Sequence, residues 1–373
     1  MRKREESCCG CGACAEICHR NAIHMVQNKE GFYYPQKDRK LCVECGRCVQ
    51  VCPFKDQNRV ISKNQYFGMR AKSEEIRYSS SSGGIFSVLA QFILSQQGVV
   101  YGAGYDVDMR VRHKEIASLS QLAQIRRTKY VQSSMSGIYS GIERRLAEDR
   151  WVLFCGTPCQ AQALRNFLGR SYEKLVTIDL VCYGVPSPGI WNDYVKYLER
   201  KHEGKMTDFS FRDKRNRDNG QTCSYIIDGK EYVSLLHQDK YCVMYFSDLI
   251  LRPSCHKCGF CTTDRGSDFT IGDFWGIERV RADLDDGMGM SMVITHTSKA
   301  ETLWNQVKKE GMWFACKEEE LKQPQLCSPA VPSKLRGCFI LLYKMFPFST
   351  LMGMLEIALN VLSKKKRLFR LLH

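Results

Sequence analysis

One cysteine spacing, C-x2-C-x2-C-x3-C, occurs twice near the start of this 373-residue chain, from Cys8 to Cys18 and from Cys42 to Cys52. This spacing is typical of cubane iron–sulfur sites, in which three closely spaced thiolates bind one cluster and the fourth cysteine binds its neighbour. The two copies therefore predict two [4Fe–4S] clusters with exchanged ligands. One cluster is assigned Cys8, Cys11, Cys14 and Cys52, and the other is assigned Cys42, Cys45, Cys48 and Cys18.

The residues between and around these ligands fit the same interpretation. Cys9 is out of register with the motif, and Gly10 and Gly46 are expected to let the backbone turn and direct amides at sulfur. Zinc is the alternative metal, because cysteine pairs also form zinc sites, but two tandem copies favour clusters. The pattern is that of a bacterial-type ferredoxin module over residues 1–58, with a hairpin between the motifs and a linker near 56–65.

Composition and charge narrow the range of partners. The 20 cysteines gather at metal-ligand spacings, and no apolar leader precedes the first motif. We therefore expect metal-binding thiolates in a reducing cytoplasm rather than a disulfide scaffold. The formal net charge is +15. No helix-turn-helix or RNA-binding signature accompanies this charge, so it favours an acidic electron-carrier protein or an anionic membrane surface over nucleic acid.

A serine–glycine run, Ser79 to Gly84, precedes a predicted helix whose apolar residues recur at helical spacing from Ile85 to Ile93. Hydroxyl and amide groups at a helix N-terminus suit a phosphate group. An N-cap followed by a flexible loop is the alternative. Further along, the sequence predicts a strand over 99–106 that enters a glycine turn, and a strand over 129–134 that feeds a loop.

A strand–helix–strand unit follows, with a cysteine at the end of each strand. WVLFC ends in Cys155, Cys159 lies in the first turn of the helix, and KLVTIDLVC ends in Cys182. The unit predicts two parallel strands, whose carboxyl ends share the edge at which open α/β sheets bind ligands. Metal ligation, buried structural cysteine and a nucleophilic thiolate at the helix N-terminus remain open as roles for these residues.

Three more cysteines, Cys255, Cys258 and Cys261, have the C-x2-C-x2-C spacing of a cubane site that lacks its fourth ligand. We expect Cys159 or Cys182 to supply that ligand, and His256 is a weaker alternative. The sequence therefore predicts a third cluster. Nearby acidic residues and Arg265 are expected to be caps, turn residues and a paired charge that support the loop.

The tail, residues 316–373, is basic and apolar, but charged residues and a proline interrupt its apolar stretches, so no span of about 20 apolar residues exists. An amphipathic segment on a membrane surface or a partner is one interpretation. A helix that docks on the protein's own core is the other.

Seven segments together resemble the β-subunit family of coenzyme F-420 hydrogenases and dehydrogenases, in particular bacterial stand-alone members with a ferredoxin module in front. They are SSSGGIFSVLA, TKYVQSS, VLFCGTPCQAQAL, DLVCYGVPSP, SFRDK, LRPSCHKCGFC and SDFTIGDFWGI, in family order between residues 66 and 300. The resemblance implies an α/β core, divided at about 66–150 and 151–315, that binds FAD and a cluster. Its fold class is α/β or α+β.

The same resemblance assigns site residues by motif. The cofactor-binding positions are Ser81, Ser82, Gly83, Gly84, Lys129 and Tyr130, and the cluster positions are Cys159, Cys182, Cys255, Cys258 and Cys261. Cys155 stands at a position that is not always cysteine in the family, so it is not assigned as a ligand.

The expected function is an iron–sulfur flavoprotein oxidoreductase. Electrons from a ferredoxin or similar donor protein would pass through [4Fe–4S] clusters to FAD and on to a small organic acceptor, such as the deazaflavin coenzyme F-420. A non-catalytic electron-transfer subunit and a redox enzyme of cell-surface polysaccharide assembly are the two alternatives.

Overall fold

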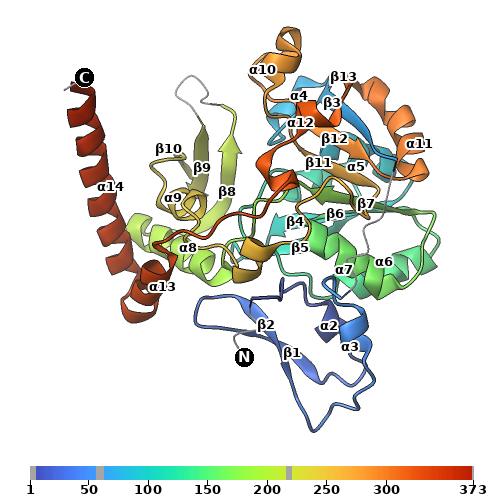
Figure 1. Ribbon diagram of the computed structural model, residues 1–373, viewed down its shortest axis with the longest axis horizontal. Helices are drawn as coiled ribbons and strands as arrows, with labels where there is room; N and C mark the ends of the chain where they lie inside the picture. The colour runs from blue at the N-terminus through green and yellow to red at the C-terminus, as the bar shows by residue number, and fades with distance from the viewer. Residues whose placement is uncertain (1–5, 56–62, 216–220, 372–373) are drawn as a thin grey trace.

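The computed structural model describes residues 6–55, 63–215 and 221–371, with side chains as far as residue 359. Most of the expected linker, residues 56–62, lies outside the described residues. The described chain is a mixed α/β structure, with the cysteine-rich N-terminal module below the body and a long helix along its left side in Figure 1.

An eight-stranded mixed sheet forms the centre of the molecule, in the order β13, β3, β12, β11, β7, β6, β4, β5. The four strands β4, β6, β7 and β11 are parallel to one another, and the outer strands are antiparallel to their neighbours. The strands are β3 (Gln65–Ala71), β4 (Val99–Tyr105), β5 (Val111–Ile116), β6 (Val152–Gly156), β7 (Leu175–Leu180), β11 (Phe269–Asp273), β12 (Ser291–Thr295) and β13 (Gly311–Cys316).

Helices cover both faces of this sheet because its parallel strands are apolar on both sides, and every residue of β6 is buried. On one face lie α5 (Ile85–Ser95) and α11 (Ser298–Val307), and on the other lie α6 (Ile138–Ala147) and α7 (Pro158–Leu168). The expected strand–helix–strand unit is β6, α7 and β7, and its strands are parallel. Strands from both predicted halves of the core share this one sheet.

A second layer of structure stands beside the main sheet (Figure 1). The antiparallel strands β8 (Met206–Asp213), β9 (Thr222–Ile227) and β10 (Lys230–Leu235) pack with α8 (Pro188–His202) and α9 (Lys240–Phe246). Aromatic side chains dominate this core, and the fully buried Trp191 donates a hydrogen bond to the Met109 carbonyl at 2.6 Å.

The N-terminal module is built from two short helices and the predicted hairpin. The helices are α2 (Ala13–Glu16) and α3 (Arg47–Gln50), and the hairpin strands are β1 (Ile23–Gln27) and β2 (Tyr33–Lys37). Each helix begins after a glycine at positive φ, Gly12 at 79° and Gly46 at 76°. The module packs against α6 and α7 through α2.

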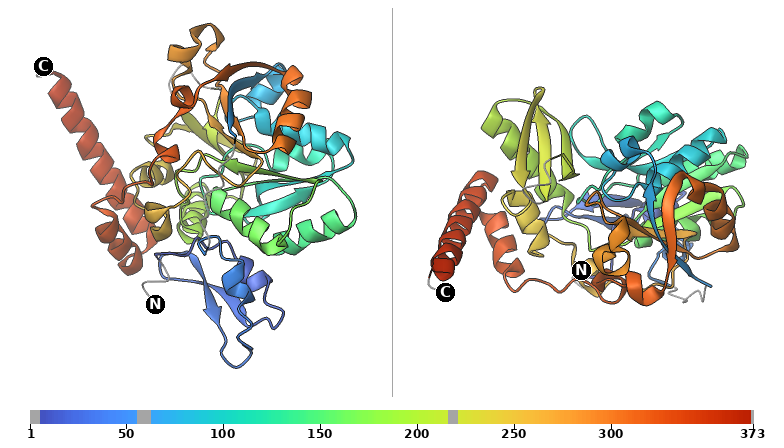
Figure 2. Two further views of the ribbon diagram at one scale, coloured as in Figure 1. Left: turned by 45° about the vertical axis from the view of Figure 1, so that its right-hand side comes forward. Right: turned by 90° about the horizontal axis from the view of Figure 1, so that it is seen from above.

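Short helices connect or extend the larger elements. These are α4 (Glu74–Tyr78), α10 (Ile277–Val280) and α12 (Glu318–Leu321). The tail then forms α13 (Arg336–Met345) and α14 (Phe348–Leu371), and both views in Figure 2 show the end of α14 standing away from the body. The first parts of these two helices bury Phe339, Ile340, Leu351 and Met352 in the core around α8 and α9.

Two local predictions were wrong. Residues 129–134 are not a strand, because only Ser134 bridges to Arg112 of β5 and the preceding residues turn away to line a cavity. The expected glycine turn near 102–104 is instead part of β4. There a Cβ at Gly104 would lie 2.5 Å from the Gln124 carbonyl, so these glycines let the following segment approach the strand closely.

Candidate functional site

The cysteines assigned to the first cluster, here called the inner set, face the core of the protein. They are Cys8, Cys11, Cys14 and Cys52. The structure brings them together. Burial and the neighbouring thiols of Cys11, Cys8 and Cys52 raise the pKa of Cys14 to about 12. The Gly10 amide donates to Cys8 Sγ at 3.4 Å, as expected for a sulfur that an adjacent amide stabilises.

The cysteines assigned to the second cluster, here called the outer set, lie at the solvent-facing end of the module. They are Cys18, Cys42, Cys45 and Cys48. Backbone amides again point at sulfur, from Ala22 to Cys18 at 3.3 Å and from Glu44 to Cys42 at 3.4 Å. Cys45 is exposed. The Glu44 amide and Lys37 side chain lower the pKa of Cys42, which favours the thiolate that a metal requires.

The cysteines of the core, here called the core set, come from three separate elements. They are Cys159, Cys182, Cys255, Cys258 and Cys261. Burial raises the pKa of Cys182 well above its usual value, and the neighbouring Cys255 and Cys159 thiols add to the shift. The structure thus places five thiols together, one more than a cubane cluster needs, so either Cys159 or Cys182 remains available as the fourth ligand.

The loop that carries three of these thiols is held by a buried ion pair. Arg265 Nη1 lies 2.7 Å from Asp179 Oδ1, and both side chains are almost fully buried. The Cys261 thiol hydrogen-bonds to Cys258 and lowers the pKa of Cys258 to about 7. His256 turns away from this group, because its Nδ1 lies 2.9 Å from the Ala330 carbonyl.

A cavity of about 280 Å³ lies beside the core set at the carboxyl ends of β6 and β7. Cys182 lines this cavity as well as contacting the other thiols. Cys155 also lines it, and its pKa rises to about 12 through burial and the nearby Asp179. Cys155 therefore belongs to the cavity wall. His113 closes the same wall and leaves its buried Nδ1 without a hydrogen-bond partner.

The serine–glycine loop forms one side of the cavity, but its residues have different tasks. Ser81 Oγ accepts from the Thr128 amide at 2.8 Å, and Ser82 Oγ donates to the Met290 carbonyl at 2.8 Å. A Cβ at Gly83 would lie 2.4 Å from the Met69 carbonyl, so Gly83 packs on β3 and does not line the cavity. Gly84, at a φ of 99°, is the N-cap of α5 and does line it.

Basic and aromatic side chains complete the cavity. Burial lowers the pKa of Lys129 to about 7. Tyr130 stacks on Tyr245 with ring centroids 4.7 Å apart. Arg212, whose Nη1 lies 2.7 Å from Asp273 Oδ2, lines the cavity next to Tyr130 and hydrogen-bonds to it. Arg126 donates to Ser79 Oγ at 2.7 Å and so places a cation close to the N-terminus of α5.

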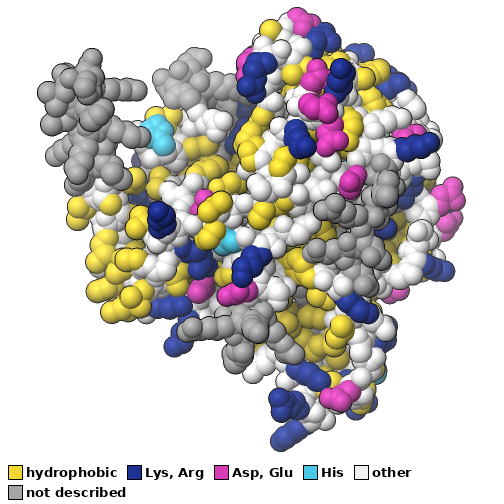
Figure 3. All heavy atoms as spheres, viewed as in Figure 1, with side chains coloured by type: hydrophobic (Ala, Val, Ile, Leu, Met, Phe, Trp, Pro, Cys, Tyr) yellow, Lys and Arg dark blue, Asp and Glu magenta, His cyan; other side chains and the backbone are white. Residues whose placement is uncertain are grey.

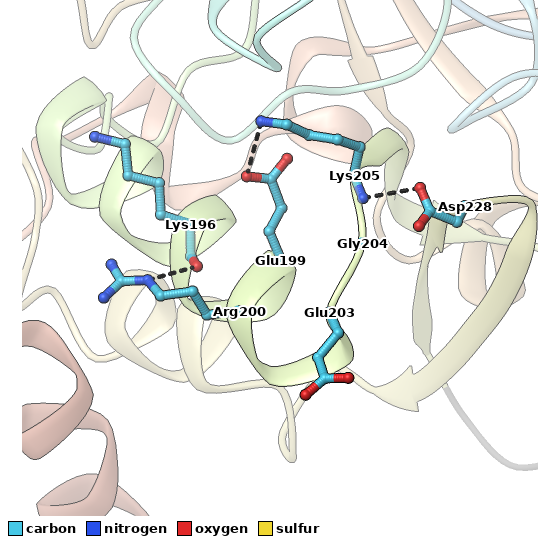
Figure 4. A pocket seen from close by; sticks show the side chains of 7 residues that line it. All are labelled: Lys196, Glu199, Arg200, Glu203, Gly204, Lys205 and Asp228. Carbon is cyan, nitrogen blue, oxygen red and sulfur yellow. Dashed lines mark hydrogen bonds and ion pairs between the residues drawn. The ribbon is translucent and has the colours of Figure 1, made fainter.

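A second, more open hollow lies on α8 and has no cysteine (Figure 4). Its charges are paired locally, since Lys205 Nζ lies 3.5 Å from Glu199 Oε2 and the Lys205 amide donates to Asp228 Oδ1 at 2.9 Å. The cavity beside the core set is therefore the stronger candidate for a binding site.

The sequence interpretation missed several residues that join these sites. Cys9, set aside as out of register, hydrogen-bonds to both Cys11 and Cys159 and so connects the inner set with the core set. Arg252 and Gln132 donate to backbone carbonyls of the first cysteine motif. A basic residue three positions before the C-x2-C-x2-C motif was the only local signal for Arg252.

Comparisons with known proteins find similarity to two kinds of domain. Residues 7–55 match the profile of a 4Fe-4S dicluster domain, and a second profile with that description matches the overlapping range 34–80. Residues 149–320 match the profile described as the C terminus of the beta subunit of coenzyme F420 hydrogenase/dehydrogenase. Residues 149–320 belong to this beta-subunit family. The chain is thus an iron–sulfur protein that joins a ferredoxin-type domain to an F420 beta-subunit domain.

The matched F420 beta-subunit domain contains the whole core set and most of the parallel sheet, whereas the serine–glycine loop, Lys129 and Tyr130 precede it. A solved chain of the F420-reducing [NiFe] hydrogenase complex from Methanosarcina barkeri, from a xenon-derivatised structure, is 18% identical, with a TM-score of 0.43. The similarity covers 78% of this chain and 91% of that chain. No curated protein matches the sequence.

Proposed function

We propose that the chain is an iron–sulfur flavoprotein oxidoreductase that takes electrons from a carrier protein and reduces a small organic acceptor. The observation that carries this proposal is the double position of Cys182, which lies among the thiols of the core set and also lines the cavity. When bound, clusters supply single electrons and a flavin supplies either one or two electrons at a time.

The three groups of thiols are connected through the protein. Cys48 lies close to Cys14 and Cys52 in the module, and Cys9 contacts both Cys11 and Cys159. The outer set, inner set, core set and cavity therefore follow one another through the molecule. This order supports three cluster sites that lead to a single cavity.

The cavity has the donor groups that a phosphorylated flavin requires. Arg126 donates to Ser79 Oγ just before the N-terminus of the 11-residue helix α5, where cations and amides favour phosphate. Lys129 lines the same cavity. The wall next to Cys182 is largely aromatic and apolar, with Tyr183 and Tyr245, and suits a planar ring. The volume of about 280 Å³ is just below the usual range for small-molecule sites and corresponds to a ring system more than to a whole dinucleotide. These features support FAD with its reacting ring in the cavity.

The outer end of the module is the proposed contact for the donor protein. Leu41, Val43 and Val49 are exposed there, at 42%, 56% and 55%. Exposed Lys40 and Arg47 stand beside them. An apolar patch with cations around it is complementary to the acidic surface of a small electron carrier. The donor would then reach the outer set first.

The proposal is tested by anaerobic electron transfer with the full chain. Reduced ferredoxin is added, and the flavin band is followed while the deazaflavin coenzyme, quinones and candidate sugars are supplied one at a time. The proposal expects flavin reduction followed by reoxidation with one acceptor. Oxidation of ferredoxin with no acceptor used, except in complex with another protein, would instead support a non-catalytic electron-transfer subunit.

The tail supports peripheral contact with a membrane. Among the described residues, no helix is long and apolar enough to cross a bilayer. Hydrophobic side chains nevertheless gather over α13 and the start of α14 (Figure 3), including Met345 and Ile357, which are 64% and 67% exposed. Lysines and arginines follow at 364–370. An apolar helix face with a basic end suits an anionic lipid surface, and work at a membrane would suit an enzyme of cell-surface polysaccharide assembly.

Flotation with anionic and neutral vesicles tests this contact. Met345→Glu with Ile357→Glu should abolish flotation, whereas Val107→Glu, at a 98% exposed site on the core, should leave it unchanged. These substitutions are preferable to truncation, because the tail buries Leu351 and Met352 in the core. Equal flotation of all variants would contradict membrane contact.

A further inference from the structure

Arg252 is a fully buried arginine at the contact between the ferredoxin-type module and the core, with an exposed fraction of 0%. Its backbone belongs to the core, since its amide donates to the Val185 carbonyl and its carbonyl accepts from the Cys255 amide, both at 2.9 Å. Its side chain reaches into the module. One residue therefore connects the loop of the core set with the inner set.

The guanidinium uses its donors on uncharged groups alone. Nε donates to the Cys8 carbonyl at 2.6 Å, Nη1 to Gln132 Oε1 at 2.8 Å and Nη2 to the Tyr33 carbonyl at 2.9 Å. Its flat face lies over the Tyr34 ring, 4.2 Å from the centroid. Within the described ranges, no carboxylate forms an ion pair with this arginine.

A buried charge without a counter-charge is strongly unfavourable in a folded protein. Among the described residues, the Arg252 charge lowers the pKa of three thiols, Cys8 and Cys11 of the inner set and Cys255 of the core set. A cubane cluster with four thiolate ligands has a net negative charge, which increases when the cluster accepts an electron. The cluster is thus the counter-charge that the protein groups do not provide.

Resting on the cluster sites of the proposed function, we infer that Arg252 is the counter-ion of the cluster bound by the inner set and raises its reduction potential above that of the outer cluster. A fixed positive charge stabilises the reduced form of the cluster more than the oxidised form, because the reduced form has one more electron. Net charge and surrounding hydrogen bonds are known determinants of cluster potentials. Arg252 does not bind the cluster itself. The inner-set cysteines are the ligands, and Arg252 holds their loop and adjusts the reduction potential of the cluster.

A substitution at Gln132 can distinguish the effect of the Arg252 charge from the effect of holding the first cysteine loop in place. Gln132 Nε2 donates to the Cys9 carbonyl at 2.8 Å, so Gln132 holds the same loop as Arg252 without carrying a charge. The loop has no spare room, because a Cβ at Gly10 would lie 2.7 Å from both Arg252 Nη1 and Gln132 Nε2. A change at either residue disturbs the loop, but only a change at Arg252 removes a positive charge.

The test is an anaerobic redox titration of the full chain, with the clusters monitored by electron paramagnetic resonance. Arg252→Gln keeps hydrogen-bonding capacity and removes the charge, Arg252→Lys keeps the charge, and Gln132→Leu is the matched control for anchoring. A Cys45→Ser variant assigns the signal of the outer cluster. We expect Arg252→Gln to reduce the equilibrium constant for reduction of the inner cluster at least tenfold, about 59 mV for a one-electron couple.

Arg252→Lys and Gln132→Leu should change that equilibrium constant much less, and the outer cluster should keep its potential in every variant. An unchanged inner potential in Arg252→Gln with full iron content would overturn the inference, and so would an equal shift in Gln132→Leu. If Arg252→Gln does not fold, a tenfold shift in Arg252→Lys would also overturn it. Absence of both signals from the wild-type chain would instead contradict the cluster sites themselves.

Discussion

Gly189 and Gly31 show how single residues hold the ferredoxin-type module against the core. Gly189 is the second residue of α8, and its amide donates to the Gly31 carbonyl at 3.0 Å. Gly31 lies at the tip of the module hairpin with a φ of 81°. A Cβ at Gly189 would lie 2.5 Å from the Gly31 Cα. Only two glycines allow the backbones to approach this closely.

We predict that Gly189→Ala destabilises the protein by about 1–3 kcal/mol, the usual range for overpacking. Alanine in a helix is ordinarily favourable by about 0.5–1 kcal/mol relative to glycine, so the clash must outweigh that gain. Gly337→Ala is the matched control, because Gly337 is also the second residue of its helix and has open space around it. Thermal unfolding of both variants measures the difference, and equal stability would contradict the close contact.

Lys129 should make the stability of the folded protein depend on pH, in a direction that its pKa determines. Burial lowers its folded pKa to about 7, whereas an unfolded lysine has a pKa of about 10.4. Between these values the unfolded chain binds the extra proton, so the contribution of Lys129 to stability increases as the pH rises from 7 to 10. Lys129→Met should remove that increase, measured as the unfolding midpoint at several pH values.

Lys309→Met, at an exposed helical site, is the control for this measurement and should leave the pH dependence intact. The same pH dependence in wild type and Lys129→Met would show that the Lys129 ammonium is not desolvated in the folded protein.

At the scale of residues, contacts could be predicted from the sequence only where the residues concerned are close together along the chain. The cysteine motifs are local patterns, so their spacing alone indicated which thiols act together. Arg252 and Cys8 are 244 positions apart, and no local pattern connects them. Three residues of the serine–glycine motif line the cavity, but the sequence could not show that Gly83 packs on β3 whereas Gly84 lines the cavity.

At the scale of elements, the edge of the parallel sheet is organised by the buried pair of Asp179 and Arg265. Asp179 is on β7, and its Oδ1 also accepts from Thr270 Oγ1 of β11 at 2.7 Å. Arg265 precedes β11 and follows the last cysteine of the core set. The pair therefore fixes two neighbouring strands and the cysteine loop at once.

We predict that Asp179→Asn destabilises the protein by about 3–5 kcal/mol, because it leaves the Arg265 charge buried without its partner. Glu148→Gln breaks the pair with Arg145, which has the exposed geometry of a surface ion pair at 2.9 Å, and should change stability by about 0–1 kcal/mol. Chemical denaturation of both variants compares these effects. A small effect of Asp179→Asn would mean that Arg265 finds another partner.

Elements with strong apolar patterns were predictable, and those shaped by the cavity were not. The apolar runs of β6 and β7 and the helical spacing of α5 identified these elements from the sequence. The run KYVQSS has the same strand-like composition. Most of its residues instead line the cavity, and Gln132 donates a hydrogen bond to the Cys9 carbonyl, so the run forms no regular strand pairing. Tertiary contacts thus overrode local preference.

At the scale of the whole molecule, hydrogen bonds from the helices of the core connect it directly to the cysteine loops of the module. Tyr139 of α6 donates to the Cys11 carbonyl at 3.0 Å, and Asn166 of α7 donates to the Cys52 carbonyl at 3.2 Å. The module therefore packs on the helices of the core through the loops of its inner set. This packing explains why the three groups of cysteines follow one another toward the cavity.

The structure supports docking of the tail on the protein's own core, one of the two interpretations drawn from the sequence. Its first residues dock on the core, where Glu356 Oε2 lies 2.8 Å from Lys240 Nζ and Tyr343 donates to Asp193 Oδ2 at 2.8 Å. Its exposed apolar face leaves a surface for a further contact. The sequence could not divide the tail in this way, because both halves have similar composition.

The central claim is that the core set binds a third cluster next to a flavin, and cofactor content after anaerobic purification tests it most directly. Iron, acid-labile sulfide and flavin are measured in the wild-type chain and in two variants, Cys258→Ser in the core set and Cys155→Ser in the cavity wall. Three cubanes predict about 12 iron atoms per chain in the wild type and in Cys155→Ser, and about 8 in Cys258→Ser, with a flavin band in the wild type. About 8 iron atoms in all three proteins, without flavin, would contradict the account.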